Sequence, residues 1–324
     1  MKLPVLPSDD ALDGEDTHLS LYCCYELSYG GFDGVDDDWE WEPSLLAVRR
    51  RLERRFLRGL RENVGPLPSL TRNTVVEGVR TLLSESDGRS LSTYMLEEGT
   101  LRQLQEFAIH RSAYQLKEAD PHTWGIPRLG GRAKAALVTI QADEYGSGVP
   151  GKSHAELFAR TMEVLGLSPR PGLYLDHLPG VTLATTNLIS MFGLHRRWRG
   201  ALVGHLAAFE MTSVVPMGRY AQAVRRLTSS AEAADFYDVH VEADTVHEQL
   251  AANSLVAGLV ADEPELAADV LFGVAALQLL ERRLADHLLR CWASGTDSLR
   301  VATTRAVGAT DLTPTLARPR QLGR

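Results

Sequence analysis

Apolar positions along this chain recur mostly at helical spacing. From Pro43 to Asn63, a set of apolar residues recurs at this spacing: Leu45, Leu46, Val48, Leu52, Phe56 and Leu60. Gaps of three and four residues line up side chains along one side of a helix. Similar stretches predict helices over 70–85, 92–119, 131–145, 153–165, 182–213, 216–227, 230–235, 236–260 and 264–294. The pattern predicts an all-α bundle of about eight to ten helices.

Polar and Pro/Gly-rich segments separate these predicted helices. Residues 1–17 are acidic and favour a loose leader, and residues 31–43 have the Asp, Gly and Trp content of a loop. We expect an irregularity near Gly193 inside the long stretch 182–213, and a break at Gly146–Gly151. The last thirty residues, with two prolines and several arginines, predict a frayed tail.

Composition narrows the class of protein. An apolar fraction of 44% and a charged fraction of 23% are ordinary for a globular domain, and 324 residues suffice for a large core. The formal charge of −8 gives no basic footprint for a nucleic acid. No run of about 18 apolar residues predicts a membrane span, and no signal peptide is evident, so we expect a cytoplasmic protein. Three cysteines, two of them adjacent, do not form a disulfide framework.

The segment 238–247, DVHVEADTVH, carries the first candidate chemistry. His240, Asp244 and His247 stand at i, i+4 and i+7, which places them on one face of a helix. Two imidazoles and a carboxylate suit iron, manganese or zinc. Glu242 and Glu248 fall off this stripe and are expected to face solvent. The alternative is a helix with two solvent-exposed histidines.

Three further carboxylates and one histidine are candidate ligands on other helices. Glu210 lies among apolar residues in AAFEMT, where a lone carboxylate is costly to bury without a cation; its alternative is the outer face of the helix. Glu144 precedes His154 by ten residues, so one ion can bind both only if the glycine-rich break unwinds the chain. An ordinary loop with a surface histidine is the alternative. Glu118 has Glu106 and Asp120 as rivals.

The order of these residues resembles that of the haem-oxygenase-like diiron oxidases and oxygenases. The matching series is a carboxylate, then Glu-x9-His, a lone Glu, and His-x3-Asp-x2-His. In this sequence it consists of Glu118, Glu144, His154, Glu210, His240, Asp244 and His247. A ferritin-like bundle would instead carry two Glu-x-x-His motifs, and Glu15–His18 is the only one here.

The resemblance implies a haem-oxygenase-like bundle over 89–298, an N-terminal extension over 1–88 and a flexible tail over 299–324. It also implies two iron ions, bridged by Glu144 or Glu210, with the three histidines as terminal ligands. Asp244 and Glu118 would complete the second iron. His110, His122, His195 and His205 would be structural or would support the ligands, and Tyr145 and Tyr237 are candidate acceptors for the ligand histidines.

The implied reaction is activation of O2 to oxidise a small amine, amino acid or fatty acid by N-oxygenation, desaturation or C–C cleavage, as in natural-product biosynthesis. We expect a small-molecule substrate, an external electron donor and a homodimer, with no nucleic acid and no membrane. The alternative is a helical protein that uses metal for regulation, or handles haem or another tetrapyrrole, without oxygenase activity. The predicted substrate pocket is lined by aromatic residues and a methionine: Phe107, Tyr114, Met191, Phe209 and Phe236.

Overall fold

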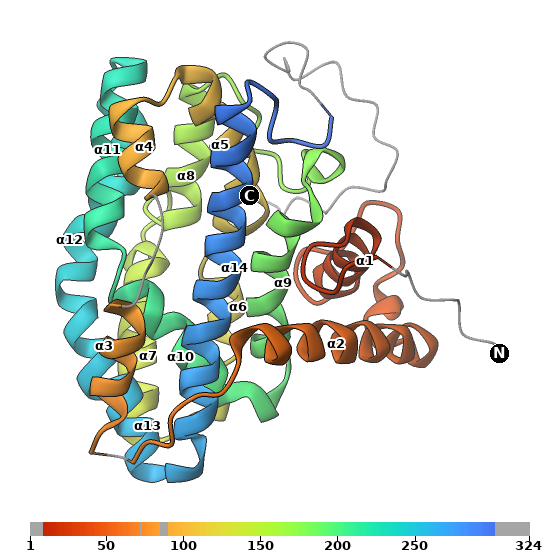
Figure 1. The fold of residues 1–324 in the computed structure, drawn as a ribbon, viewed down its shortest axis with the longest axis vertical. Coiled ribbons are helices and arrows are strands. Elements are labelled where there is room, and N and C mark those ends of the chain that lie inside the picture. The colour runs from red at the N-terminus through yellow and green to blue at the C-terminus, as the bar shows by residue number, and fades with distance from the viewer. Residues whose placement is uncertain (1–8, 72, 85–89, 302–324) are drawn as a thin grey trace.

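A computed structural model of the chain describes residues 9–71, 73–84 and 90–301, and these residues form helices and no strand. The predicted all-α class is confirmed (Figure 1). The α-helices are α1 (Glu15–Glu26), α2 (Pro43–Val64), α3 (Val75–Ser84), α4 (Leu91–Glu97), α5 (Leu101–Gln115), α6 (Asp120–Thr123), α7 (Gly131–Glu144), α8 (His154–Val164), α9 (Gly180–Leu194), α10 (Arg199–Glu210), α11 (Val214–Thr228), α12 (Asp235–Leu250), α13 (Ala257–Asp262) and α14 (Ala267–Ala293). A π-helical turn, η7 (Ala251–Val256), joins α12 to α13.

The bundle packs most closely where α10 meets α14. A β-carbon on Gly204 would lie 1.9 Å from the carbonyl oxygen of Val270, and one on Gly273 would lie 2.1 Å from that of Ala201. Only glycine allows the two backbones to approach so closely. This contact brings the end of α10, which carries Glu210, into the interior of the bundle.

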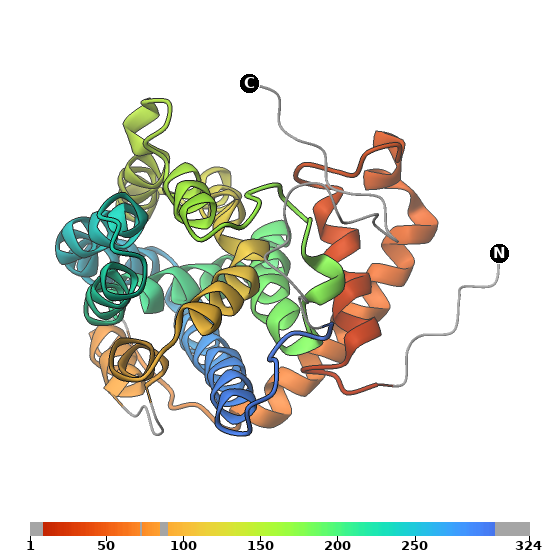
Figure 2. The same cartoon turned by 90° about the horizontal axis from the view of Figure 1, so that it is seen from above.

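The N-terminal helices are part of the packed molecule. Leu21 of α1 and Phe56 of α2 are fully buried in the same apolar cluster as Leu188 of α9. Asn187 of α9 donates to the carbonyl oxygen of His18 at 2.8 Å. In both views α1 and α2 lie on the side opposite α11 and α12 (Figures 1 and 2). The prediction of a loose leader over residues 1–17 is therefore wrong from Glu15 onward, because α1 begins there and packs against α9.

Two predicted long helices are each divided. The stretch 92–119 breaks after Glu97, because Thr100 caps α5 by exchanging hydrogen bonds with Gln103. The stretch 182–213 breaks between α9 and α10, close to the expected irregularity. There Arg128 donates to the backbone carbonyl groups of Gly193 and Leu194, which a helix end leaves without partners.

Two other segments predicted as irregular contain local order. The loop 31–43 includes a short 3-10 helix, Asp37–Trp41. In the predicted tail, Ser298 donates to Glu106 at 3.1 Å from its backbone N–H, and Arg300 donates to the carbonyl of His177 at 2.9 Å. Residues 302–324 lie outside the described residues.

Membrane-spanning criteria are met by no single helix in the described ranges. Only the bent pair Arg196–Glu210 and Val214–Thr228 has the required length and apolar composition when its two members are combined.

Candidate metal centre

The break between α7 and α8 positions two candidate ligands. Gly146, Ser147 and Gly148 all adopt positive φ values, which turn the chain back after Glu144. Ser153 then caps α8 and makes His154 its first residue. The Nδ1 atom of His154 lies 2.8 Å from Oε2 of Glu144. The unwinding predicted for this pair therefore occurs, and both side chains are buried.

Helix α12 contributes three buried side chains from one face. His240, Asp244 and His247 are exposed by only 5%, 2% and 1%. Glu242 is exposed and Glu248 is half-buried, in line with their place off the stripe. The alternative of two surface histidines is therefore wrong. The same holds for Glu210, which is 5% exposed rather than on an outer face.

One group of candidate ligands gathers around His240. The group consists of Glu118, Glu144, His154 and His240, whose potential ligand atoms all lie within 4.8 Å of one another. Nε2 of His240 is 3.6 Å from Oε2 of Glu118. Its Nδ1 lies 2.7 Å from the carbonyl oxygen of Phe236. A proton on Nδ1 donates there and leaves the Nε2 lone pair directed at the carboxylates.

A second group shares one residue with the first. Glu144, Glu210 and His247 also have ligand atoms within 4.8 Å of one another. Nδ1 of His247 lies 3.2 Å from Oε2 of Glu210 and 3.6 Å from Oδ1 of Asp244. Because Glu144 belongs to both groups, its carboxylate lies between two neighbouring sites. Asp244 belongs to neither group, although its Oδ1 atom is close to His247. The expectation that Asp244 and Glu118 hold one ion stays a prediction.

Unsatisfied polar atoms test whether the centre suits a cation. Within the described residues, Oε2 of Glu118, Oε2 of Glu144 and Nδ1 of His154 are buried without a hydrogen-bond partner. Although the last two lie 2.8 Å apart, their mutual orientation does not make a hydrogen bond. Buried polar atoms without partners are costly and rare. Lone pairs of oxygen and nitrogen that converge in this way fit divalent iron.

The charges of the cation-free centre also favour binding of a cation. Burial alone would lower the pKa of both α12 histidines. The Glu118 and Glu144 carboxylates instead raise the pKa of His240 to about 10, and Asp244 and Glu210 raise that of His247 to about 11. Burial raises the pKa of Glu210 to about 8. Without metal, protons therefore supply part of the positive charge that the carboxylates require.

The rival carboxylates have other roles. Glu106 accepts hydrogen bonds from Trp292 at 2.9 Å and from both the backbone and the hydroxyl of Ser298. Asp120 accepts from the hydroxyl of Tyr145 at 2.7 Å. Neither belongs to a candidate group, whereas Glu118 does.

The four histidines that we expected to be structural or supporting also lie outside the two groups. His110 contacts Thr182 at 2.7 Å, and His195 contacts Glu53 at 2.9 Å. His122 and His205 contact each other at 3.3 Å. These contacts agree with the prediction that the four histidines have structural roles.

Two supporting residues were missed by the sequence reasoning. Asp143 accepts a hydrogen bond from Nε2 of His247 at 2.9 Å, which leaves Nδ1 for the centre. Ser213 donates its hydroxyl proton to Asp244. Asp143 directly precedes Glu144, but adjacency on a helix gives no sign that both face His247. The expectation for Tyr145 is wrong, because its hydroxyl contacts Asp120 and Thr123 rather than a candidate ligand.

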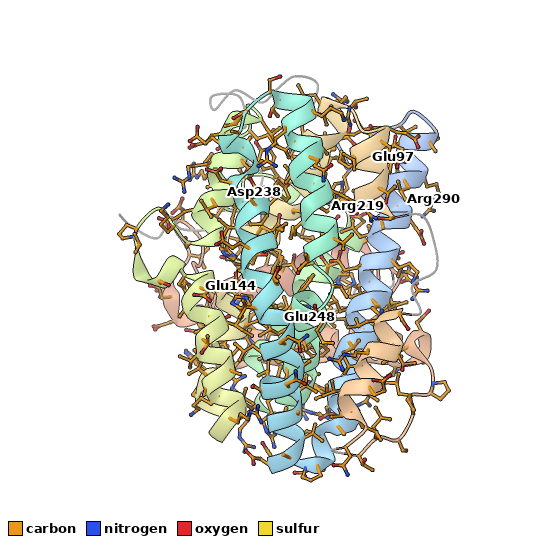
Figure 3. All side chains as sticks on the ribbon, turned by 90° about the vertical axis from the view of Figure 1, so that its left-hand side faces the viewer. Glu97, Glu144, Arg219, Asp238, Glu248 and Arg290 are labelled. Atoms are coloured by element: carbon orange, nitrogen blue, oxygen red, sulfur yellow. The ribbon has the colours of Figure 1, made fainter. Side chains whose placement is uncertain are left out.

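A surface pocket of about 580 Å³ reaches the centre between α7, α8 and α12. Figure 3 views this side, with Glu144 and Asp238 labelled. Its lining includes His154 from the first group and His247 from the second. None of the five residues predicted to line a substrate pocket belongs to it. Two of them, Tyr114 and Phe209, stack on each other with ring centroids 5.9 Å apart.

Comparison with known proteins supports the same chemistry. A family described as iron-containing redox enzymes matches residues 105–282, more than half of the chain and a range that includes all seven candidate ligands. A nitrosourea synthase from Streptomyces achromogenes subsp. streptozoticus is 26% identical over 145 residues, which is 45% of this chain. The match spans only 31% of that protein. With its all-helical fold and this family match, the chain belongs to the iron-containing redox enzymes of the haem-oxygenase-like superfamily.

Proposed function

We propose that this chain is an O2-dependent, non-haem diiron oxidase or oxygenase that oxidises a small organic substrate. The observation that carries the proposal is Glu144, which belongs to two adjacent groups of buried ligand atoms. A carboxylate offers two oxygens, so one residue can bind two ions at once. A single structural metal site would need no second group.

In this proposal the residues divide between two ions. Glu118, His154 and His240 would hold one ion, Glu210, Asp244 and His247 would hold the other, and Glu144 would be shared between them. When bound, the iron pair supplies the electrons that activate dioxygen. The protein orients the imidazoles through the Phe236 carbonyl and Asp143, and buries the ligand set away from water.

The substrate class is proposed from the reaction types of the superfamily: N-oxygenation, desaturation or oxidative C–C cleavage. The partial similarity to a nitrosourea synthase favours oxidation at nitrogen, because a nitrosourea contains an N–O bond. A pocket of about 580 Å³ is within the range of small-molecule sites. An external electron donor would complete the cycle if the reaction consumes more electrons than the substrate supplies.

The test is anaerobic loading with Fe(II), followed by mixing with oxygenated buffer in a stopped-flow spectrometer. We expect oxidation of bound iron with a visible absorbance change, repeated in the presence of candidate amines and amino acids. The Asp244→Ala variant serves as a control. It should lose the rapid oxidation of bound iron, while its circular dichroism spectrum remains that of a helical protein. Iron that stays ferrous in oxygen with every candidate would contradict the proposal and favour a structural or sensing metal.

A further inference from the structure

Glu118 is the one candidate ligand of the seven that lies outside a helix. The other six belong to α7, α8, α10 or α12, whereas Glu118 lies in the turn 116–119 that follows α5. Backbone hydrogen bonds fix the direction of side chains along a helix, and connecting segments are more mobile. The place of Glu118 in the first group of ligands therefore depends on contacts made by its neighbours in this turn.

The residue before this ligand, Lys117, is held by the N-terminal extension. Its ammonium group forms an ion pair with Glu26 of α1, and the two side chains are exposed by only 12% and 5%. The same nitrogen lies 4.7 Å from the ring centroid of Tyr22 and 4.4 Å from that of Tyr29, where the faces of the rings attract a cation. Tyr29 in turn contacts α9, because its hydroxyl donates to Ser190 at 3.3 Å. We call the three residues around the ammonium group the lysine cage: Tyr22, Glu26 and Tyr29.

The attachment of α1 to the bundle does not require the lysine cage. Leu21 of α1 is fully buried in the apolar cluster that it shares with α9, and Asn187 of α9 donates to the carbonyl oxygen of His18. A buried ion pair contributes little net stability, because removing two charges from water costs about as much as their attraction returns. What the cage does fix is the place of a residue one peptide unit away from a candidate ligand.

We propose that the lysine cage positions Glu118, so that the N-terminal extension sets the metal affinity of the first group of ligands. This inference rests on the proposed iron centre. Consecutive Cα atoms are held about 3.8 Å apart, so a displacement of Lys117 also displaces Glu118. On the other side of the ligand, Ala119 accepts a hydrogen bond from Gln141 of α7 at 2.8 Å, so the turn is anchored at both flanks. Glu26 is thus a positioning residue, on a helix that lies outside the residues matched by the family.

The experiment compares Glu26→Gln with a matched variant, Glu281→Gln. Each removes one carboxylate from a largely buried ion pair, so the change in net charge is the same. Glu281 pairs with Arg111, which lies in the body of α5 rather than in the turn. The probe is Co(II), and chelator competition gives the affinity of each of its two positions. We expect Glu26→Gln to weaken one position about tenfold, and Glu281→Gln to change neither by more than about twofold.

A double-mutant cycle separates positioning of the ligand from general support of the fold. In a Glu118→Ala background, Glu26→Gln should change Co(II) affinity by no more than about twofold, because the side chain through which the cage acts is gone. If Glu26→Gln does not fold, Tyr29→Leu takes its place in the cycle. That variant removes one ring of the cage, keeps the ion pair, and should weaken the same position about two- to threefold.

Three results would overturn the role of the lysine cage and leave the proposed function intact. They are unchanged Co(II) affinity in Glu26→Gln, equal losses in Glu26→Gln and Glu281→Gln, and a loss that persists in the Glu118→Ala background. The first shows that Glu118 keeps its place without the cage, the second shows an effect of charge alone, and the third shows a general effect on the fold. A wild-type chain that binds no Co(II) and no Fe(II) would overturn the proposed function as well.

Discussion

Hydrogen bonding separates the candidate ligands from similar residues nearby. Glu106 and Glu118 are both buried or nearly buried and lie on the same stretch of chain. Glu106 is fully engaged by Trp292 and Ser298, whereas Oε2 of Glu118 has no hydrogen-bond partner among the described residues. A buried carboxylate with partners stabilises the fold, and one without partners is stabilised by a cation. This contrast yields a paired prediction.

Glu118→Ala should lower the iron content of the chain, because it removes a ligand of the first group, and should leave the helical circular dichroism spectrum intact. Glu106→Ala should keep its iron but lose about 1–3 kcal/mol of unfolding free energy, because the Trp292 N–H is left without its partner. Iron analysis and chemical denaturation measure both effects. The reverse pattern would transfer the ligand role to Glu106.

Asp143 should influence metal affinity without binding metal itself. Asp143→Ala removes the acceptor for Nε2 of His247 and should weaken binding at the second position about 10–100-fold, as measured by chelator competition. Asp143→Asn keeps an acceptor oxygen and should lose less metal affinity than Asp143→Ala. Asp238→Ala, in the same pocket but without a contact to His247, is the control for equilibrium affinity. Equal losses in the two alanine variants would contradict this role.

At the scale of elements, the α7–α8 break forms the centre by ending one helix and starting the next. A continuous helix would hold Glu144 and His154 about 15 Å apart along its axis. Gly146, at φ +61°, faces the backbone of Lys152 so closely that an added β-carbon would lie 2.4 Å from the Lys152 carbonyl carbon. The return of the chain therefore depends on this glycine.

Gly146→Ala should reduce iron binding and destabilise the chain by about 1–3 kcal/mol, since it combines a strained φ with a backbone clash. Gly148→Ala is the matched control. Gly148 also has a positive φ of +74°, but an added β-carbon there meets nothing within 4 Å. Thermal denaturation and iron content should both change more in the first variant. Equal iron content in the two variants would show that the close approach at Gly146 does not set the ligand geometry.

At the scale of the whole molecule, periodicity and spacing predicted the features that local sequence determines. The helical class, the break after Glu144 and the single face of α12 follow from residue order alone. The interruptions at Thr100 and beyond Leu194 were not predicted in full. The first depends on a local cap, Thr100 with Gln103, which the prediction missed. The second depends on a distant partner, Arg128, which donates to the carbonyl of Gly193. Asp143 could not be found for the same reason, since its role depends on α7 lying beside α12.

Buried histidines should make the whole molecule sensitive to acid. Burial lowers the pKa of His18 to about 4, and that of His110 and His122 to about 3. In the unfolded chain these groups bind protons below about pH 6.5, while the folded chain does not bind them until about pH 4. Unfolding makes these three groups take up protons, so their contribution to stability falls as the pH drops from about 6.5 to 4, by up to about 4 kcal/mol per pH unit. In the metal-free protein Glu210, with its pKa of about 8, releases a proton on unfolding and offsets about 1.4 kcal/mol per pH unit of this loss.

Denaturation of the metal-free protein across this pH range measures the slope. His110→Asn, which removes one titrating group, should lower the proton uptake on unfolding by about one. A slope that is flat below pH 6.5, or unchanged in the variant, would contradict the assignment.

The most direct test of the central claim is a count of ions per chain by native mass spectrometry after anaerobic loading with Fe(II). The account predicts two ions in the wild type and at most one in Glu144→Ala, because that carboxylate belongs to both groups. Circular dichroism should confirm that the variant stays helical. A wild-type chain with one ion, or a folded Glu144→Ala chain that still holds two, would contradict a bridged diiron centre.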